Sequence, residues 1–201
     1  MGTARGRAEK RPAGYPSEYE TVARLRDGRT VRICPIVPGD APELADAIRT
    51  ADPETLHSRF LGAPPPLTDA VLTRLTCVDY VNRFALVARS RSRGVGIARY
   101  AVLPPAEDGS VAAELAVAVA PEWRRVGLAT VLVEQLARRA QECGITHVSA
   151  LFSAANRPVA ALAREGHARV VITGGAAQLD AALGAAHKDW PSLERTGVDE
   201  S

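Results

Sequence analysis

The stretch PEWRRVGLATVLVEQL, residues 121–136, directly follows the apolar run LAVAVA at 115–120. The run predicts a buried strand, whereas apolar side chains from Leu128 onward recur every three or four positions, which predicts one buried face of an α-helix. Gly127 and two arginines stand in the turn between them. A helix N-terminus presents unpaired N–H groups and a positive dipole end, so this turn is a candidate site for phosphate or pyrophosphate.

Three other interpretations of this turn can be compared with the sequence: a turn that binds no ligand, a P-loop and a dinucleotide-binding loop. A glycine with flanking arginines is also common in strand-to-helix turns that bind no ligand. The sequence contains no G-x-x-x-x-G-K-[ST] pattern, and no G-x-G-x-x-G opens the helix. A P-loop nucleoside triphosphatase and a dinucleotide-binding fold are therefore rejected.

The length, charge and cysteine content of the chain exclude several classes of protein. The chain has 201 residues, of which 46% are hydrophobic, enough for one substantial core. Its formal net charge of +2 gives no support for a nucleic-acid or membrane partner. Cys34, Cys77 and Cys143 are widely spaced and form no Cys-x-x-Cys pair, which argues against a disulfide framework and a zinc site. No apolar stretch is long enough to span a membrane, and the cysteine usage suits a reducing compartment, so we expect a cytoplasmic protein. We expect no bound metal, because the sequence has no metal-ligand spacing.

The two ends differ in composition from the middle of the chain. Residues 1–20 combine glycine, proline and charge with almost no aliphatic side chains, which predicts a disordered basic tail. Residues 184–201 are mostly polar, and we expect a flexible C-terminal tail there. Residues 21–183 then form the folded domain.

Helical and strand patterns alternate within this domain. Asp27-Gly28 lies between two alternating runs and predicts a hairpin with a type I′ turn. We expect further strands at 83–90, 94–104, 110–119, 147–153 and 168–173, and helices at 41–51, 53–60, 68–75, 128–143 and 157–165, the last capped by Asn156. The segment 176–183 fits a strand after a Gly-Gly turn, but its alanines fit a helix equally well.

The six residues RRVGLA, Arg124 to Ala129, resemble the R/Q-x-x-G-x-G/A acyl-CoA loop of the GNAT N-acetyltransferase superfamily. The order of the predicted elements over residues 29–183 is similar as well. Three segments, RDGRTVRICPIVPGDA at 26–41, PETLHSRFLG at 53–62 and NRPVAALARE at 156–165, further resemble bacterial protein-lysine acetyltransferases, some of which act on acyl-CoA synthetases. The sequence departs from that group at Cys34, where it usually has arginine, and at His167, where it usually has phenylalanine.

The resemblance implies an α+β fold with a central, mostly antiparallel, splayed sheet of six to seven strands and four to five flanking helices. It implies acetyl-CoA as cosubstrate and no metal. Backbone amides around the loop would hold the pyrophosphate, and the backbone of Val117 and Val119 would pair with the pantetheine arm. The implied acetyl-CoA-binding residues are Val117, Val119, Arg124, Arg125, Val126, Gly127, Leu128, Ala129, Thr130 and Asn156.

Glu114 is the only charged residue between Val111 and Ala120. A carboxylate within an apolar strand either reaches water at an edge or is buried with a function, and burial would raise its pKa. A lysine amine, with a pKa of about 10.4, needs a base before it can attack an acyl group at neutral pH. Protein-lysine acetyltransferases have such a glutamate in an A-E-[LIV] strand before the loop, so the resemblance implies that Glu114 is the general base.

The acceptor and the general acid are less defined. Ala163 stands where many relatives have a tyrosine that protonates the departing thiolate, and none of the four tyrosines is an obvious substitute. The first expectation for the acceptor is a protein lysine and the second is a small amine. A non-catalytic acyl-CoA-binding regulatory module is the alternative, because it would keep the anion-binding loop without needing a base.

Overall fold

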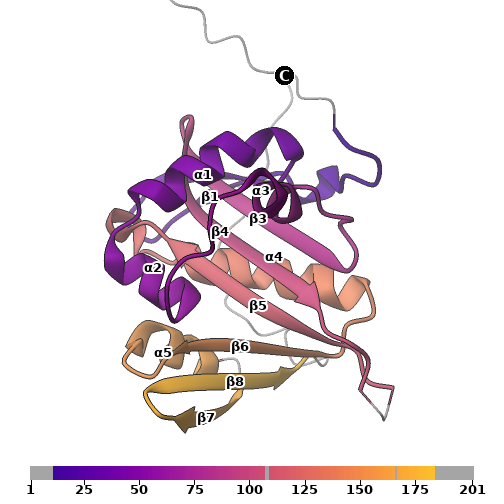
Figure 1. Ribbon diagram of the computed structural model, residues 1–201, viewed down its shortest axis with the longest axis vertical. Helices are drawn as coiled ribbons and strands as arrows, with labels where there is room; N and C mark the ends of the chain where they lie inside the picture. Colours follow the sequence, from indigo (N-terminus) through magenta and orange to yellow (C-terminus); the bar gives the residue numbers. More distant parts are fainter. Residues whose placement is uncertain (1–10, 107–108, 166, 184–201) are drawn as a thin grey trace, which may run out of the picture.

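A single sheet forms the centre of the computed structural model, which describes residues 11–106, 109–165 and 167–183. Its strand order is β1-β2-β3-β4-β5-β6-β8-β7, and β5 with β6 is the parallel pair among otherwise antiparallel neighbours (Figure 1). The strands are β1 Thr21–Arg24, β2 Thr30–Pro35, β3 Arg83–Ser90, β4 Arg93–Val102, β5 Ala112–Val119, β6 His147–Ser153, β7 Arg169–Thr173 and β8 Ala176–Ala182. The α-helices are α1 Ala41–Thr50, α2 Pro53–Phe60, α3 Asp69–Thr76, α4 Leu128–Glu142 and α5 Arg157–Glu165.

The expected α+β fold with a mostly antiparallel sheet is confirmed, with one more strand than the six to seven expected. The additional strand comes from the segment that fits a helix and a strand equally well. This segment, β8, pairs with β6 along seven residues and with β7 on its other side, and the two ladders satisfy its backbone groups. Five helices are described, within the expected range.

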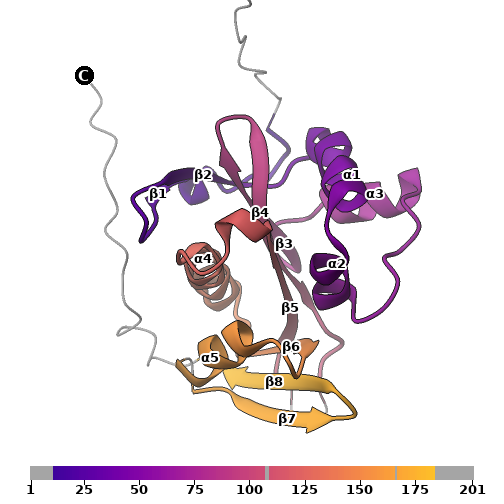
Figure 2. The same ribbon diagram turned by 90° about the vertical axis from the view of Figure 1, so that its left-hand side faces the viewer.

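Helices cover both faces of the sheet. The first three, α1 to α3, lie on one face, and α4 and α5 lie on the other (Figure 2). The periodic apolar residues of α4 are all buried: Leu128, Val131, Leu132, Leu136 and Ala140. They pack in one cluster with buried residues of β3, β4 and β5, and each buried leucine stabilises the fold by about 1.5–3 kcal/mol.

The N-terminus of α4 approaches β4 closely at Gly96. A Cβ atom on Gly96 would stand 3.1 Å from Leu128 Cδ2 and 3.3 Å from Leu132 Cδ1. Both distances are shorter than ordinary van der Waals contact. The missing side chain therefore allows the first turn of α4 to lie directly on the strand.

The hairpin of β1 and β2 is confirmed, but its turn is not type I′. Its loop has three residues, in which Gly28 N donates to Leu25 O at 2.9 Å and Leu25 N donates to Arg29 O at 2.8 Å. Gly28 takes the positive φ of +85°, whereas Asp27 does not have a positive φ. This is the type I turn followed by a left-handed glycine that three-residue hairpin loops adopt.

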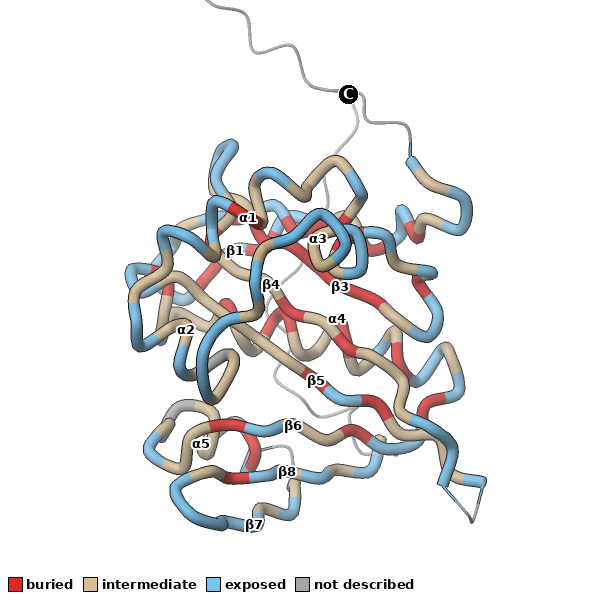
Figure 3. The backbone as a smooth tube through the Cα atoms, viewed as in Figure 1, coloured by how far each residue is buried: buried red, intermediate tan, exposed pale blue. Residues whose placement is uncertain are grey.

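Part of the segment expected to be a disordered tail belongs to the core. Ser17–Tyr19 form a short 3₁₀ helix. Buried residues gather along the central strands β3 and β4 (Figure 3), and Tyr19, which is 1% exposed, belongs to the same core. Its ring packs edge-on against Phe84 at 5.3 Å between centroids, and its hydroxyl donates to Glu142 Oε2 at 2.8 Å. The folded domain thus begins before residue 21. The rest of the two tail predictions, residues 1–10 and 184–201, lies outside the described residues.

Tyr19→Ala should lower the free energy of unfolding by about 3 kcal/mol, because it removes a buried aromatic ring and leaves a cavity. Urea denaturation of the full chain measures this loss. The matched control is Ser17→Ala at an exposed position of the same 3₁₀ helix, with an expected change within about 0.5 kcal/mol. Equal effects of the two substitutions would place Tyr19 outside the core.

Candidate active site

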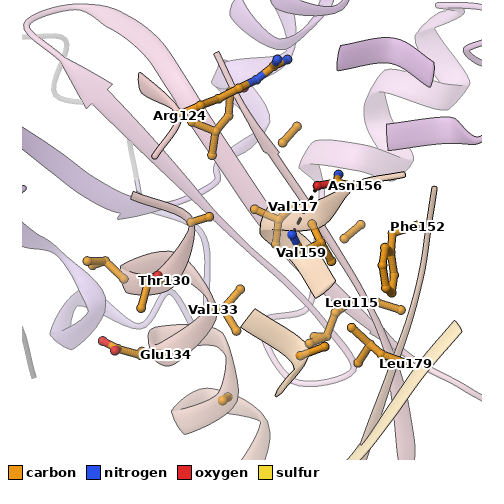
Figure 4. Close-up of a pocket in the computed structure, with 18 of the residues that line it drawn as sticks. Leu115, Val117, Arg124, Thr130, Val133, Glu134, Phe152, Asn156, Val159 and Leu179 are labelled. Atoms are coloured by element: carbon orange, nitrogen blue, oxygen red, sulfur yellow. Dashed lines mark hydrogen bonds between the residues drawn. The ribbon is translucent and has the colours of Figure 1, made fainter. Parts of the chain in front are cut away.

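A cleft of about 1850 Å³ opens where β5 and β6 separate. The two strands pair only from Ala112 to Glu114 and from His147 to Ser149, whereas β6 continues to Ser153 and pairs with β8 along its whole length. Side chains of α4 line one side of the cleft, and side chains of β6 and α5 line the other, with β5 between them (Figure 4). The volume exceeds that of a typical pocket for a drug-sized ligand, about 300–1,000 Å³, so an extended ligand and a second substrate both have room.

Most of the site residues expected from the sequence line this cleft. They are Glu114, Val117, Val119, Arg124, Arg125, Gly127, Ala129, Thr130 and Asn156. Val126 and Leu128 do not line it. Leu128 is 1% exposed in the core, and the half-buried Val126 packs against the same cluster. Only the backbone amides of these two residues remain candidates for the site.

The turn before α4 leaves a series of N–H groups without acceptors. The first hydrogen bond of the helix runs from Val131 N to Gly127 O at 3.1 Å. Within the described part of the chain, no acceptor is found for the N–H groups of residues 125–130. Arg125 and Gly127 both have left-handed backbone, with φ of +62° and +92°. Non-glycine residues rarely adopt this conformation, and consecutive amides arranged in this way form a cradle for an anion.

The backbone of β5 offers a second set of groups. Ala112 O accepts from Leu103 N, and Ala120 N donates to Val95 O, so even-numbered residues of β5 direct their backbone groups toward β4. Odd-numbered residues therefore direct theirs toward β6. Val117 and Val119 lie beyond the last residue of β5 that pairs with β6, so no strand meets their N–H and C=O groups on that side. An extended ligand containing amides can pair with such an edge.

Glu114 lies on the same face of β5 as α2. The helix covers a later part of the strand and leaves Glu114 open. Of the two alternatives for this carboxylate, the structure shows the one that reaches water, because Glu114 is exposed. Its cross-strand neighbours on this face, Ala101 and Ser149, are small, and the separation of β5 from β6 begins at this point. The carboxylate therefore stands at the open mouth of the cleft, where a second substrate can reach it.

Asn156 has a structural role in the site. Its Oδ1 accepts from Val159 N at 3.3 Å, which caps α5 as the sequence predicts (Figure 4). Ala163 of α5 is 5% exposed and lines the cleft. No tyrosine lines it, since Tyr19, Tyr80 and Tyr100 are buried in the core and Tyr15 packs against it. No phenol is thus in place to protonate a leaving group.

Arg124 differs from the expectation for a phosphate ligand. Its guanidinium turns toward the N-terminus of α2, where Nη2 donates to Thr55 Oγ1 at 2.6 Å. Nη1 lies 3.3 Å from Glu54 Oε1, and Nη2 lies 3.7 Å from Asp52 Oδ2. Arg125, in contrast, is exposed on the turn and lines the cleft. A sequence motif cannot show this separation, because it depends on a contact with a helix about 70 residues earlier.

The profile of the Acetyltransferase (GNAT) family matches residues 54–167, a span that contains α2 from its second residue onward, β5, the turn, α4 and α5. The chain belongs to this family. An acetyltransferase of Pseudomonas aeruginosa is 36% identical over 140 residues, which cover 68% of this chain and 73% of that protein. This GNAT protein is accordingly an acetyl-CoA-dependent N-acetyltransferase, with acetyl-CoA as its cosubstrate.

Solved GNAT structures share the fold. The GNAT domain of PAT from S. lividans is 27% identical, with a TM-score of 0.75 over 84% of this chain and 99% of that chain. The yncA structure from Salmonella typhimurium, determined with its cofactor acetyl-CoA, is 16% identical, with a TM-score of 0.63 over 82% of this chain and 98% of that chain. In the GNAT chain described here, the unpaired amides of the turn and the free edge of β5 fit the pyrophosphate and the amide-containing arm of that coenzyme.

The described residues of this GNAT chain lack two classes of feature. No helix there combines the length and apolar character required to cross a bilayer. No group of three His, Cys, Asp or Glu side chains there is arranged to hold a metal ion.

Ala129→Glu should raise the Kd for acetyl-CoA at least about tenfold, because the new carboxylate would face the pyrophosphate at the mouth of the amide cradle. The fold should be unaffected, since a negative charge in the first turn of a helix is favourable. Isothermal calorimetry measures the affinity and thermal unfolding checks the fold. Ala47→Glu, at an exposed position of α1, is the matched control with unchanged affinity. Equal affinities of both variants would exclude the turn as the pyrophosphate site.

Proposed function

We propose that this GNAT N-acetyltransferase acetylates lysine side chains of proteins, by direct attack in a ternary complex with Glu114 as general base. The observation that carries the proposal is the position of Glu114, exposed at the mouth of the cleft beside the unpaired edge of β5. The resemblance of three segments of the sequence to bacterial protein-lysine acetyltransferases supports a protein acceptor, and the GNAT domain of PAT from S. lividans, 27% identical, shares the fold.

A base is needed because the acceptor is protonated in solution. A lysine amine with a pKa of about 10.4 is about 99.9% protonated at pH 7.4, and freeing its lone pair costs on the order of 4 kcal/mol. Glu114 can accept that proton directly or through a water molecule. Exposure suits this role, since the side chain must meet an amine that arrives on the surface of another protein and must then release the proton to solvent.

The other residues around the cleft bind acetyl-CoA in our proposal. In our proposal the amides of residues 125–130 hold the pyrophosphate, and the backbone of Val117 and Val119 pairs with the pantetheine arm. Acetyl-CoA supplies the thioester carbonyl carbon, to which the amine nitrogen forms its bond while the carbon–sulfur bond breaks. The thiol of coenzyme A, with a pKa of about 8.5 like other thiols, can leave as thiolate near neutral pH. A general acid is therefore dispensable, which is consistent with Ala163 in the place of a tyrosine.

The class of acceptor is tested by measuring coenzyme A release with a panel of amines. The panel contains lysine-bearing acyl-CoA synthetases, lysine peptides, polyamines and aminoglycosides. We expect release with polypeptide lysines and incorporation of one acetyl group per modified lysine by mass spectrometry. Release only with the small amines would replace the protein acceptor by a small-molecule acceptor. Acetyl-CoA binding without release from any acceptor would favour a regulatory acyl-CoA-binding module.

Glu114→Gln should lower the rate of acetyl transfer at pH 7.5 by about 10²-fold or more, because it keeps the shape of the side chain but removes the base. The Kd for acetyl-CoA should stay within twofold. Toward pH 10 the variant should recover, since the acceptor amine then loses its proton unaided. Single-turnover rates across this pH range measure the effect.

The matched control for this substitution is Glu18→Gln. Glu18 lines the same cleft on the far side of α4, so its substitution tests whether any loss of a cleft carboxylate slows transfer. The control should keep the rate of the unmodified protein. A Glu114→Gln rate within a few-fold of that rate, with chemistry limiting, would refute the assignment and direct the search for a base to His57 of α2.

A further inference from the structure

The two adjacent arginines of the coenzyme turn have different surroundings. Arg125 is exposed, and no ion pair of its guanidinium is found among the described residues. The Arg124 side chain is 31% exposed, and its guanidinium is surrounded by protein acceptors. The turn thus directs one arginine toward the cleft and the other toward α2.

All three nitrogens of the Arg124 guanidinium have partners. Nε donates to Val119 O at 3.4 Å, Nη2 donates to Thr55 Oγ1 at 2.6 Å, and Nη1 pairs with Glu54 Oε1 at 3.3 Å. Two carboxylates, those of Glu54 and Asp52, lie within 3.7 Å of one guanidinium and offset part of its positive charge. An arginine paired in this way adds less attraction for a phosphate.

The partners of Arg124 are the residues that begin α2. Asp52 is the N-cap of this helix and accepts from Thr55 N at 2.9 Å. Thr55 Oγ1 donates to the second carboxylate oxygen of Asp52. Hydrogen bonds from the hydroxyl and the amide of Thr55, together with the charge of Arg124, lower the pKa of Asp52. Asp52 therefore stays ionised at every pH at which a lysine amine can be acetylated.

The helix α2 is short and only partly covered in the part of the chain that the structure describes. It has eight residues, and none of those whose exposure is described is buried. Helices this short are not stable by themselves and depend on contacts with the rest of the fold. The α2 helix packs against β5 and β6, and its residues Glu54, Thr55, His57 and Phe60 line the cleft. It covers the face of β5 that carries Glu114.

We propose that Arg124 is a positioning residue for the acceptor substrate, which fixes α2 over the mouth of the cleft by joining its first turn to the end of β5. Binding of the acceptor then depends on Arg124, whereas binding of acetyl-CoA depends on Arg125 and on the backbone amides of the turn. The inference rests on the proposed function in one respect, that the acceptor enters on the Glu114 side.

The matched pair Arg124→Gln and Arg125→Gln tests this division. Arg124→Gln should raise the KM for the lysine acceptor found in the panel about tenfold and leave the Kd for acetyl-CoA within twofold. Arg125→Gln should do the reverse, raising the Kd for acetyl-CoA several-fold without changing the acceptor KM. A rise in the Kd for acetyl-CoA of about tenfold in Arg124→Gln would make Arg124 a pyrophosphate ligand and overturn the inference.

A second measurement does not need an acceptor. Amide hydrogen exchange of residues 53–60 in the full chain should be faster in Arg124→Gln and unchanged in Arg125→Gln. Thr55→Val should accelerate the same amides, and its effect should be smaller when added to Arg124→Gln, because both substitutions remove the hydrogen bond from Arg124 Nη2 to Thr55 Oγ1. Unchanged exchange of α2 in Arg124→Gln would overturn the inference.

The two sets of experiments separate this inference from the proposed function. If no amine in the panel is acetylated, the exchange data and the acetyl-CoA affinities still decide whether Arg124 holds α2. If Glu114→Gln keeps full activity while Arg124→Gln raises the acceptor KM, the assignment of the base fails and the role of Arg124 stands.

Discussion

The site depends on the early separation of two parallel strands. Because β5 and β6 pair over only three residues each, the backbone of β5 beyond Glu114 has no strand on one side. Unpaired backbone groups inside a protein are costly unless another polar group meets them. Here β6 pairs with β8 on its other edge along its whole length, while the later residues of β5 and β6 have no strand between them. The cleft is thus a consequence of the sheet topology, and the functional side chains are arranged along its edges.

The cleft has two differently built sides. On the α4 face, the binding groups that we propose are mostly backbone amides, whose positions are set by the helix and by the left-handed residues of the turn. On the α2 face, they are side chains of a short helix that is anchored by polar contacts. A backbone site changes little with sequence, whereas a side-chain site changes with each substitution. One fold can in this way keep the same coenzyme while accepting different second substrates.

Local patterns predicted most of this fold. The boundaries of α4 followed from its apolar period, and those of β6 followed from a run between Gly144 and the Asn156 cap. The errors arose where contacts distant in sequence decide the outcome. Tyr19 is buried because of Phe84 and Glu142, which composition near the N-terminus cannot reveal. Glu114 stands in an apolar run, but alanines occupy both faces of that run, so the pattern did not distinguish the covered face from the open one. The coenzyme turn could be predicted from its glycine and helix start, whereas the partner of Arg124 could not.

Gly96 determines how closely the first turn of α4 approaches β4. The helix that presents the amides rests on β4 where that strand has no side chain, with Leu128 and Leu132 over the bare backbone. The turn continues directly into α4, so a methyl group at Gly96 would require Leu128 and Leu132 to shift by a few tenths of an ångström, and the first turn of the helix with them. In our proposal this shift would change the distance between the amides that hold the pyrophosphate and the edge of β5 that meets the pantetheine arm. The spacing between the two halves of the proposed coenzyme site thus depends on a side chain that is missing from β4, a strand outside the cleft lining.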